Sequence, residues 1–171
     1  MASGPLAYID NGECRLVSRN GNRFRGFADL ANWIGQNLRA VSAVLDGEIA
    51  CVDDRAVFED LLFRQRQCLY FAFDLLFLNG DDLRELPLVE RKARLKTLIR
   101  KHRSRMLSVD HIEQRGCEFF DKACELDLEG VVAKRKDSRY RVTEKRSPHW
   151  IKIKNRTYTQ AEGREELFER A

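Results

Sequence analysis

Alternation of apolar and polar residues predicts the strands of this chain. Two short alternating runs flank Asn11-Gly12, a pair that favours a tight hairpin turn. A later run is almost continuously apolar, which predicts a strand buried on both faces, and Asn79-Gly80 marks the turn after it. The predicted strands cover residues 6–10, 14–18, 43–52, 69–78, 107–111, 130–136 and 150–154.

Apolar residues spaced three or four positions apart predict the helices. Asp53-Asp54 offers an N-cap for one helix, and Pro87 suits the first turn of another. The last helix carries an apolar stripe of Phe119, Phe120, Ala123 and Leu126, which we expect to face inward. Helices are thus predicted over residues 24–38, 57–62, 87–102 and 115–126. Together with the strands they predict an α+β fold of mostly antiparallel sheet with packed helices, forming a single domain over residues 1–171.

Composition favours a cytoplasmic globular protein. The chain has 171 residues, of which 43% are hydrophobic and 34% charged. No apolar run approaches the roughly 20 residues that span a bilayer, and the N-terminus has no signal-peptide pattern. The five cysteines are odd in number and form no CxxC pair, which predicts reduced thiols and neither disulfides nor zinc. The three histidines share no metal-ligand spacing.

Positive charge is concentrated near the C-terminal end. The formal net charge is only +4, yet residues 134–156 contain ten Lys or Arg against Asp137 and Glu144. Such a stripe suits a polyanion such as ATP or a DNA backbone, although a solvated surface loop has the same composition. The ten are Lys134, Arg135, Lys136, Arg139, Arg141, Lys145, Arg146, Lys152, Lys154 and Arg156.

Lys152 and Lys154 lie two residues apart on a predicted strand, so both point to one face. Paired ammonium groups of this kind can clamp a phosphate. Lysines on an edge strand also point into water and prevent aggregation, which is the alternative. Ile151 and Ile153 point to the opposite face, where we expect a core.

Two carboxylates stand beside glycines at strand ends. Glu48 follows Asp46-Gly47, and Glu129 precedes the strand that begins at Gly130. A glycine lets a ligand approach closely, and Mg²⁺ takes one or two carboxylates together with substrate phosphates. Alternatively, each Glu caps a turn or pairs with a nearby Lys.

Phe73 and Arg19 complete the candidate set. Phe73 lies in the apolar strand, where a purine can stack on its ring if the strand lines a pocket; otherwise it is an ordinary core aromatic. Arg19 lies in a Ser-Arg-Asn-Gly turn and is either a phosphate or ribose contact or part of a plain surface turn.

The order of these short motifs closely resembles that in the nucleotidyltransferase domain of ATP-dependent DNA ligases. The similarity covers the chain from Leu6 onward and extends to small bacterial ligases and end-joining enzymes. The motifs are Ser18-Arg19-Asn20-Gly21, Leu45-Asp46-Gly47-Glu48, Phe73-Asp74-Leu75-Leu76, Leu128-Glu129-Gly130-Val131-Val132-Ala133-Lys134 and Trp150-Ile151-Lys152-Ile153-Lys154-Asn155.

The resemblance implies an ATP-grasp-like ligase domain that adenylates itself and seals nicked double-stranded DNA in repair and recombination. Its cofactors would be ATP and Mg²⁺. The implied roles are nucleotide or nick-phosphate contact for Arg19, ribose and metal contact for Glu48, adenine stacking for Phe73, metal binding for Glu129, ATP-phosphate binding for Lys152 and Lys154, and DNA-phosphate contact for Lys134 and Arg135. A separate repair-protein partner is not specified by the sequence.

The chain departs from the family pattern at both ends. Met1 to Pro5 stands where the family has Lys-x-Asp-Gly-x-Arg, so the nucleophilic Lys is absent. An N-terminal truncation or a shifted reading frame would account for this. No OB-fold follows the last strand. We therefore expect an incomplete adenylation domain that cannot adenylate itself. The alternatives are a non-catalytic nucleotide- or DNA-binding remnant, or a relative of RNA ligases and capping enzymes.

Overall fold

The computed structural model describes residues 4–18, 20–52, 67–100, 104–141 and 148–159. The chain divides into two compact units, residues 1–109 and 110–171. The predicted helix over residues 57–62 and Arg19 itself lie outside the described residues, whereas the Gly21 amide of the predicted turn donates to the Ser18 oxygen at 2.9 Å. The prediction of a single domain over residues 1–171 stays a prediction.

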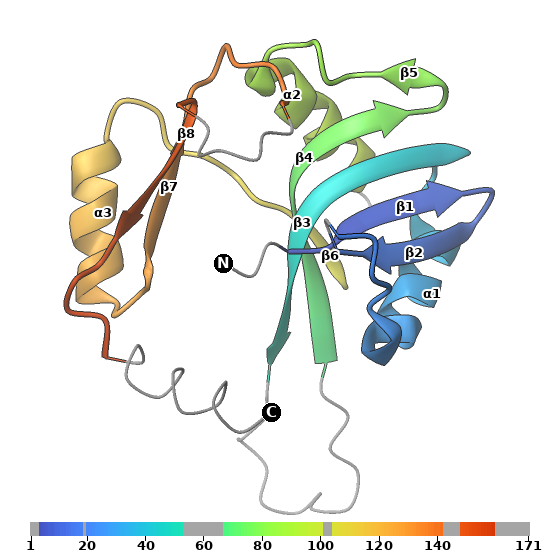
Figure 1. Cartoon of the computed structure of the whole chain (residues 1–171), viewed down its shortest axis with the longest axis horizontal. Helices are drawn as coiled ribbons and strands as arrows, with labels where there is room; N and C mark the ends of the chain where they lie inside the picture. Colours follow the sequence, from blue (N-terminus) through green and yellow to red (C-terminus); the bar gives the residue numbers. More distant parts are fainter. Residues whose placement is uncertain (1–3, 19, 53–66, 101–103, 142–147, 160–171) are drawn as a thin grey trace, which may run out of the picture. The chain divides into compact units, whose positions relative to one another are not determined.

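The first unit is built on one six-stranded sheet, shown from blue to yellow in Figure 1. Its strand order is β2-β1-β3-β4-β5, all antiparallel, and β6 pairs in parallel with β4. The strands are β1 Leu6–Asp10, β2 Glu13–Val17, β3 Ser42–Val52, β4 Gln67–Leu78, β5 Asp81–Asp82 and β6 Met106–Ser108.

Local sequence explains these elements. Asn11 and Gly12 have positive φ angles of 45° and 84°, the conformation that a two-residue hairpin turn between β1 and β2 requires. A 3-10 turn at Arg25–Phe27 leads into α1, Ala28–Asn37, and Pro87 caps α2, Leu88–Ile99. α1 packs on β2, and α2 packs on β4. The core between sheet and helices includes Leu30, Ile34, Leu45, Tyr70, Leu75 and Leu95.

The second unit, in the described residues, has α3, Gly116–Glu125, and a two-stranded antiparallel sheet of β7, Gly130–Lys134, and β8, Trp150–Lys154. The sheet and helix positions agree with the sequence prediction, but their burial does not. Ile151 and Ile153 are 57% and 41% exposed, so the expected core on that face of β8 is wrong. α3 packs against β7, which leaves the apolar side chains of β8 open.

The predicted inward stripe of α3 is also wrong in part. Ala123 is buried and Phe120 half-buried, whereas Phe119 is 46% and Leu126 65% exposed. A two-stranded sheet is too narrow to cover a stripe of four apolar residues, so its outer members stay in solvent.

The cysteines give a further correction. Cys51 and Cys68 face each other at the ends of β3 and β4 and form a disulfide, where the sequence predicts reduced thiols. Cys14, Cys117 and Cys124 are free, and burial raises the pKa of the Cys14 thiol to about 12. Sequence spacing misses the pair because antiparallel pairing brings together residues 17 apart. No helix in the described part of the chain is long and apolar enough to cross a membrane.

Candidate functional site

Gly47 owes its place in β3 to the close approach of Tyr70 from β4. A Cβ atom on Gly47 would lie 2.5 Å from the carbonyl oxygen of Phe71 and 2.6 Å from the Tyr70 ring. Tyr70 is fully buried, and its hydroxyl donates to the backbone oxygens of Pro5 and Leu45 at 3.0 and 3.1 Å. Glycine at this position therefore allows β3 to lie flat against the ring.

Glu48 follows this close contact and points to the other face of the sheet. Its side chain is exposed, and its partner across the strand pair is Phe71. Phe73 lies two residues further along β4, at the shift in pairing register between Asp46 and Gly47 of β3. Phe71 and Phe73 are both half-buried. The first unit thus presents the Glu48 carboxylate beside the Phe71 ring on one sheet face, with Phe73 at the adjoining register shift.

Three lysines share one face of the second unit's sheet. Lys152 lies opposite Val132, Lys154 opposite Gly130, and Lys134 opposite Trp150. Directly paired residues point to the same side, so all three ammonium groups belong to one face. The Nζ atom of Lys134 lies 4.0 Å from the centre of the Trp150 ring, a cation-π contact. We call Lys134, Lys152 and Lys154 the lysine face.

Glu129 lies beside the lysine face. Its Oε1 accepts a hydrogen bond from Nζ of Lys152 at 2.8 Å, and both side chains are about two-fifths exposed (43% and 39%). The backbone oxygen of Glu129 accepts from the Asn155 amide at 2.9 Å. The sequence alternative in which Glu129 pairs with a nearby Lys is thus confirmed as the contact in this structure. The Glu129 carboxylate therefore occupies the Lys152 ammonium group, and a phosphate that binds Lys152 must compete with it.

Gly130 allows the two strands of this sheet to approach closely. Its φ is 143°, and a Cβ atom there would lie 2.1 Å from the carbonyl oxygen of Ile153. Any side chain would therefore push β8 away from the start of β7. The Glu-Gly step of the motif fixes the distance between Glu129 and the lysine-bearing strand.

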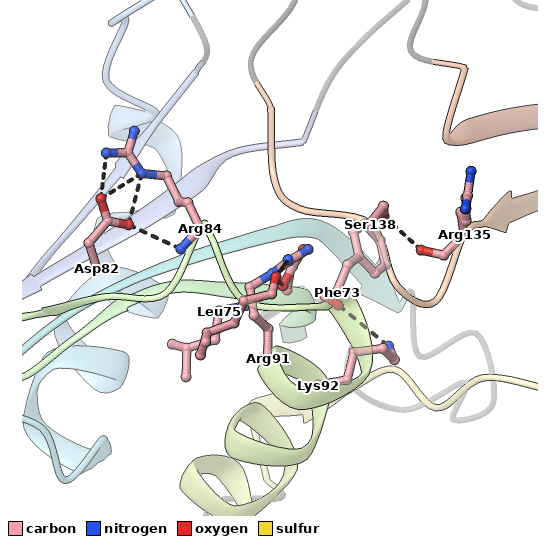
Figure 2. A network of polar contacts seen from close by, with 10 residues as sticks. Phe73, Leu75, Asp82, Arg84, Arg91, Lys92, Arg135 and Ser138 are labelled. Atoms are coloured by element: carbon pink, nitrogen blue, oxygen red, sulfur yellow. Dashed lines mark hydrogen bonds and ion pairs between the residues drawn. The ribbon is translucent and has the colours of Figure 1, made fainter.

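Arg135 directly follows β7, and its guanidinium group forms an ion pair with the Asp137 carboxylate. Its Nε and Nη2 donate to the Asp137 carboxylate at 2.8 and 3.0 Å. This hydrogen bonding raises the pKa of Arg135 and lowers the pKa of Asp137. Ser138 donates its hydroxyl to the Arg135 backbone oxygen at 2.6 Å, as Figure 2 shows. A depression of about 270 Å³ opens here, lined by Arg135, Asp137, Ser138, Arg139, Arg141 and His149.

The donor chemistry fits Mg²⁺ bound together with a phosphate ligand. Each unit offers one such carboxylate, Glu48 in the first and Glu129 in the second, and a single carboxylate suffices for Mg²⁺ when phosphates supply further oxygens. In the described ranges no three His, Cys, Asp or Glu side chains gather as a metal cluster.

Sequence reasoning missed two parts of these units. Arg91 and Asp74 form a fully buried ion pair, 2.8 Å between Nη2 and Oδ2. The signal was present, since Arg91 occupies an inward position of its helix and Asp74 interrupts an apolar strand. In the sequence, Arg139 and Arg141 are members of the basic stripe and His149 is an isolated histidine, because spacing alone does not show that they line one hollow.

Comparison with known proteins identifies the fold and the protein family of this chain. The chain has the fold of DNA ligase nucleotidyltransferase domains: it superposes on the ligase domain of LigD from M. tuberculosis with a TM-score of 0.70 and 29% identity, over 90% of this chain and 52% of that one. A mycobacterial DNA ligase D complexed with ATP and MES gives a TM-score of 0.67 at 29% identity, with the same coverage of both chains.

The family model described as "ATP dependent DNA ligase domain" matches residues 6–154, and the chain belongs to that family. The multifunctional non-homologous end joining protein LigD of Pseudomonas aeruginosa is 33% identical over 157 residues, 87% of this chain and 18% of that protein. The prophage-derived DNA ligase-like protein LigB of Bacillus subtilis is 32% identical over 68% of this chain and 46% of its own length. The resemblance seen in the motif order is confirmed, and the chain spans less than half of each of these two curated relatives.

Proposed function

We propose that the chain carries the nucleotide- and DNA-binding surfaces of an ATP-dependent DNA ligase and supports the sealing of nicked double-stranded DNA in repair or recombination, in the cytoplasm. The observation that carries this proposal is the lysine face with Glu129 held 2.8 Å from Lys152. Two lysines two residues apart, next to a carboxylate, suit a nucleoside triphosphate accompanied by Mg²⁺.

Each candidate residue has one role in this proposal. Phe73 stacks on adenine, and Glu48 contacts the ribose or the metal. Lys152 and Lys154 neutralise the ATP phosphates, while Glu129 ligates Mg²⁺. Lys134 and Arg135 contact the DNA backbone, and Arg19, outside the described residues, is proposed to contact the nucleotide or the nick phosphate. Mg²⁺, when bound, neutralises charge that develops on the transferred phosphate.

The proposed reaction ends at the nick. The 3′-hydroxyl oxygen attacks the phosphorus of an adenylated 5′-phosphate, a new phosphodiester bond forms, and the bond to AMP breaks, so that AMP leaves with its electron pair. The hydroxyl proton passes to solvent. This step needs no lysine nucleophile, whereas formation of the enzyme adenylate does. The 171-residue sequence contains no lysine before Lys92.

The test is sealing of a pre-adenylated nicked duplex by the full chain with Mg²⁺. We expect slow formation of the joined strand with release of AMP. Glu129→Gln should reduce it strongly because it removes a metal ligand, while Glu125→Gln is the matched control, since Glu125 is an exposed carboxylate paired with Lys122 at 2.5 Å.

The outcomes separate the alternatives. No joined strand at high protein concentration, with retained binding of nicked DNA in a gel-shift assay, would favour a non-catalytic binding module. Equal or faster sealing of the matching RNA nick would favour the RNA ligase or capping relatives instead.

A further inference from the structure

Phe73 is an extra residue in the pairing of β3 with β4. Asp46 pairs with Asp74, whereas the next residue of β3, Gly47, pairs with Ala72, so the register skips Phe73. A second register shift lies between Val44 and Leu45 of β3. A β-bulge bends its strand, increases the local twist and re-aims the side chain of the extra residue. The direction of the Phe73 ring therefore depends on the side-chain contacts that stabilise this bulge.

The first anchor of the bulge is a buried ion pair. Arg91 of α2 donates from Nε and Nη2 to both carboxylate oxygens of Asp74, each at 2.8 Å, and both side chains are fully buried. Oδ1 of Asp74 also accepts the backbone amide of Leu75 at 2.9 Å, and Arg91 Nη1 donates to the Leu86 oxygen at 2.5 Å. The residue after Phe73 is thus fixed to the helix.

The second anchor comes from the next residue of the same helix. Nζ of Lys92 donates to the backbone oxygen of Val109 at 2.8 Å and lies 3.4 Å from that of Phe73, a contact drawn in Figure 2. The regular pairing of β6 with β4 ends at Ala72, and the Val109 amide still donates to the Ala72 oxygen at 2.9 Å. Lys92 therefore contacts the backbone of β4 at Phe73, directly after the last residue of β4 that pairs with β6.

We propose that Lys92 is a positioning residue for nucleotide binding: together with Arg91 it holds the bulge that aims Phe73 at the adenine base. This inference rests on the proposed stacking role of Phe73. Lys92 suits the task because it is half-buried and its ammonium group contacts two backbone oxygens, those of Val109 and Phe73. Removal of Lys92 loosens the bulge while the buried Arg91 pair keeps the fold.

The experiment compares binding of ATP with binding of inorganic triphosphate, both with Mg²⁺, by titration calorimetry on the full chain. Triphosphate engages the phosphate-binding lysines but has no base to stack. Lys92→Met should weaken ATP binding about fivefold or more while triphosphate affinity stays nearly unchanged. Lys92→Arg, which keeps hydrogen-bond donors at this place, should restore much of the loss. Arg94→Met, an exposed position of the same helix, is the matched control for loss of one positive charge.

Two further measurements make the inference sharp. In a Phe73→Leu background, Lys92→Met should cause no additional loss of ATP affinity, because the ring that it positions is gone. Amide hydrogen exchange should become faster over residues 72–75 in Lys92→Met and not in Arg94→Met. Exchange does not depend on nucleotide, so it reports the bulge directly.

The results separate this inference from the proposed function. If Phe73→Leu weakens ATP binding but Lys92→Met does not, or if Lys92→Met weakens ATP and triphosphate equally, the positioning role is overturned and the proposed function stands. If the wild-type chain does not discriminate ATP from triphosphate, the stacking role fails and the inference fails with it.

Discussion

Nζ of Lys152 lies 2.8 Å from Oε1 of Glu129. The candidate phosphate-binding residue, Lys152, is thus paired with the candidate metal-binding residue, Glu129. Any phosphate that binds Lys152 must compete with this carboxylate unless a cation takes the carboxylate over. We therefore expect the pair to couple phosphate binding to Mg²⁺ binding.

The first prediction concerns Glu129→Gln. Without Mg²⁺, the variant should bind inorganic triphosphate about two- to fivefold more tightly than the wild type, because a competing negative charge is lost. With Mg²⁺ the order should reverse, because the metal ligand is lost as well. Titration calorimetry with and without the metal measures both affinities. Glu125→Gln should change neither, and an unchanged Mg²⁺ dependence in Glu129→Gln would contradict the assignment.

The buried pair of Arg91 and Asp74 makes a prediction about stability. Arg91→Met leaves the Asp74 carboxylate buried without its guanidinium and should lower the free energy of unfolding by about 3–5 kcal/mol. The double variant Arg91→Met with Asp74→Leu should recover a large part of this loss, because both charges are gone. Urea denaturation followed by circular dichroism measures the difference.

The control for this pair is the exposed one between Arg84 and Asp82. Asp82 has its pKa lowered to about 2, chiefly by the side-chain hydrogen bond from Arg84, yet the pair lies in solvent. Arg84→Met should leave the unfolding midpoint almost unchanged. Equal effects of the two arginine substitutions would show that burial is not what makes the Arg91 pair important.

The next prediction concerns the proposed DNA contact of Arg135, with which the Asp137 carboxylate competes. Asp137→Asn removes the carboxylate that engages the Arg135 guanidinium at 2.8 and 3.0 Å, so nicked duplex DNA should bind more tightly. Arg135→Met should weaken binding and reduce the slope of log affinity against log salt by about 1, the value for one lost phosphate contact. Fluorescence anisotropy over a range of salt concentrations measures both. Asp121→Asn, an exposed acid on α3, is the charge-matched control, and equal tightening by both acid substitutions would point to net charge alone.

Strand and turn positions were predictable because each follows from local chemistry. Asn11-Gly12 and Asn79-Gly80 adopt the positive φ angles that their composition favours. The strands β1, β2 and β4 have the predicted extents within two residues, whereas the short strand β5 is not predicted. Pro87 caps α2 where its missing amide is harmless. The shared face of Lys152 and Lys154 also follows from strand alternation alone.

Burial and pairing were not predictable from local pattern. Ile151 and Ile153 look like core residues in any alternating strand, and only the width of the sheet that covers them decides their exposure. The bulge at Phe73 depends on a strand about 25 residues upstream, so no spacing within β4 shows it. For the same reason the contact between Glu129 and Lys152, 23 residues apart, could be weighed but not decided.

A pH dependence is expected from Asp127, which ties the residues after β8 to the end of α3. Its carboxylate accepts the hydroxyl and amide of Thr159 at 2.5 and 3.0 Å, and these hydrogen bonds lower its pKa, the hydroxyl bond most. A lowered folded-state pKa gives stability that is present above the unfolded value of about 3.9 and is lost as the pH falls through the folded value.

Asp127→Asn is the variant that isolates this charge. Asp127 has a φ of 49°, which asparagine also tolerates, so the substitution removes the charge without straining the backbone. The wild type should be more stable than the variant near neutral pH, and the difference should shrink as the pH falls below the unfolded-state pKa of about 3.9 and through the lower folded-state pKa. The comparison comes from the midpoints of urea unfolding of both proteins, measured from about pH 2.5 to about pH 7. A constant difference over this whole range would show that the carboxylate charge plays no part.

The last prediction concerns covalent chemistry. The first lysine of the 171-residue sequence is Lys92, and it is engaged with the backbone oxygens of Val109 and Phe73. Lys134 and Lys152 are likewise engaged with Trp150 and Glu129. Attack on the α-phosphate of ATP needs a positioned, activated amine, and a displacement of about 1 Å is costly.

We therefore expect no covalent AMP adduct when this chain is incubated with α-labelled ATP and Mg²⁺ and separated by denaturing electrophoresis. Placing a Lys-x-Asp-Gly-Phe-Arg segment before Leu6 should produce the labelled band, and replacing its Lys with Met should remove it. A band from the unaltered chain would mean that one of its own lysines serves as the nucleophile, and mapping the labelled peptide would identify which.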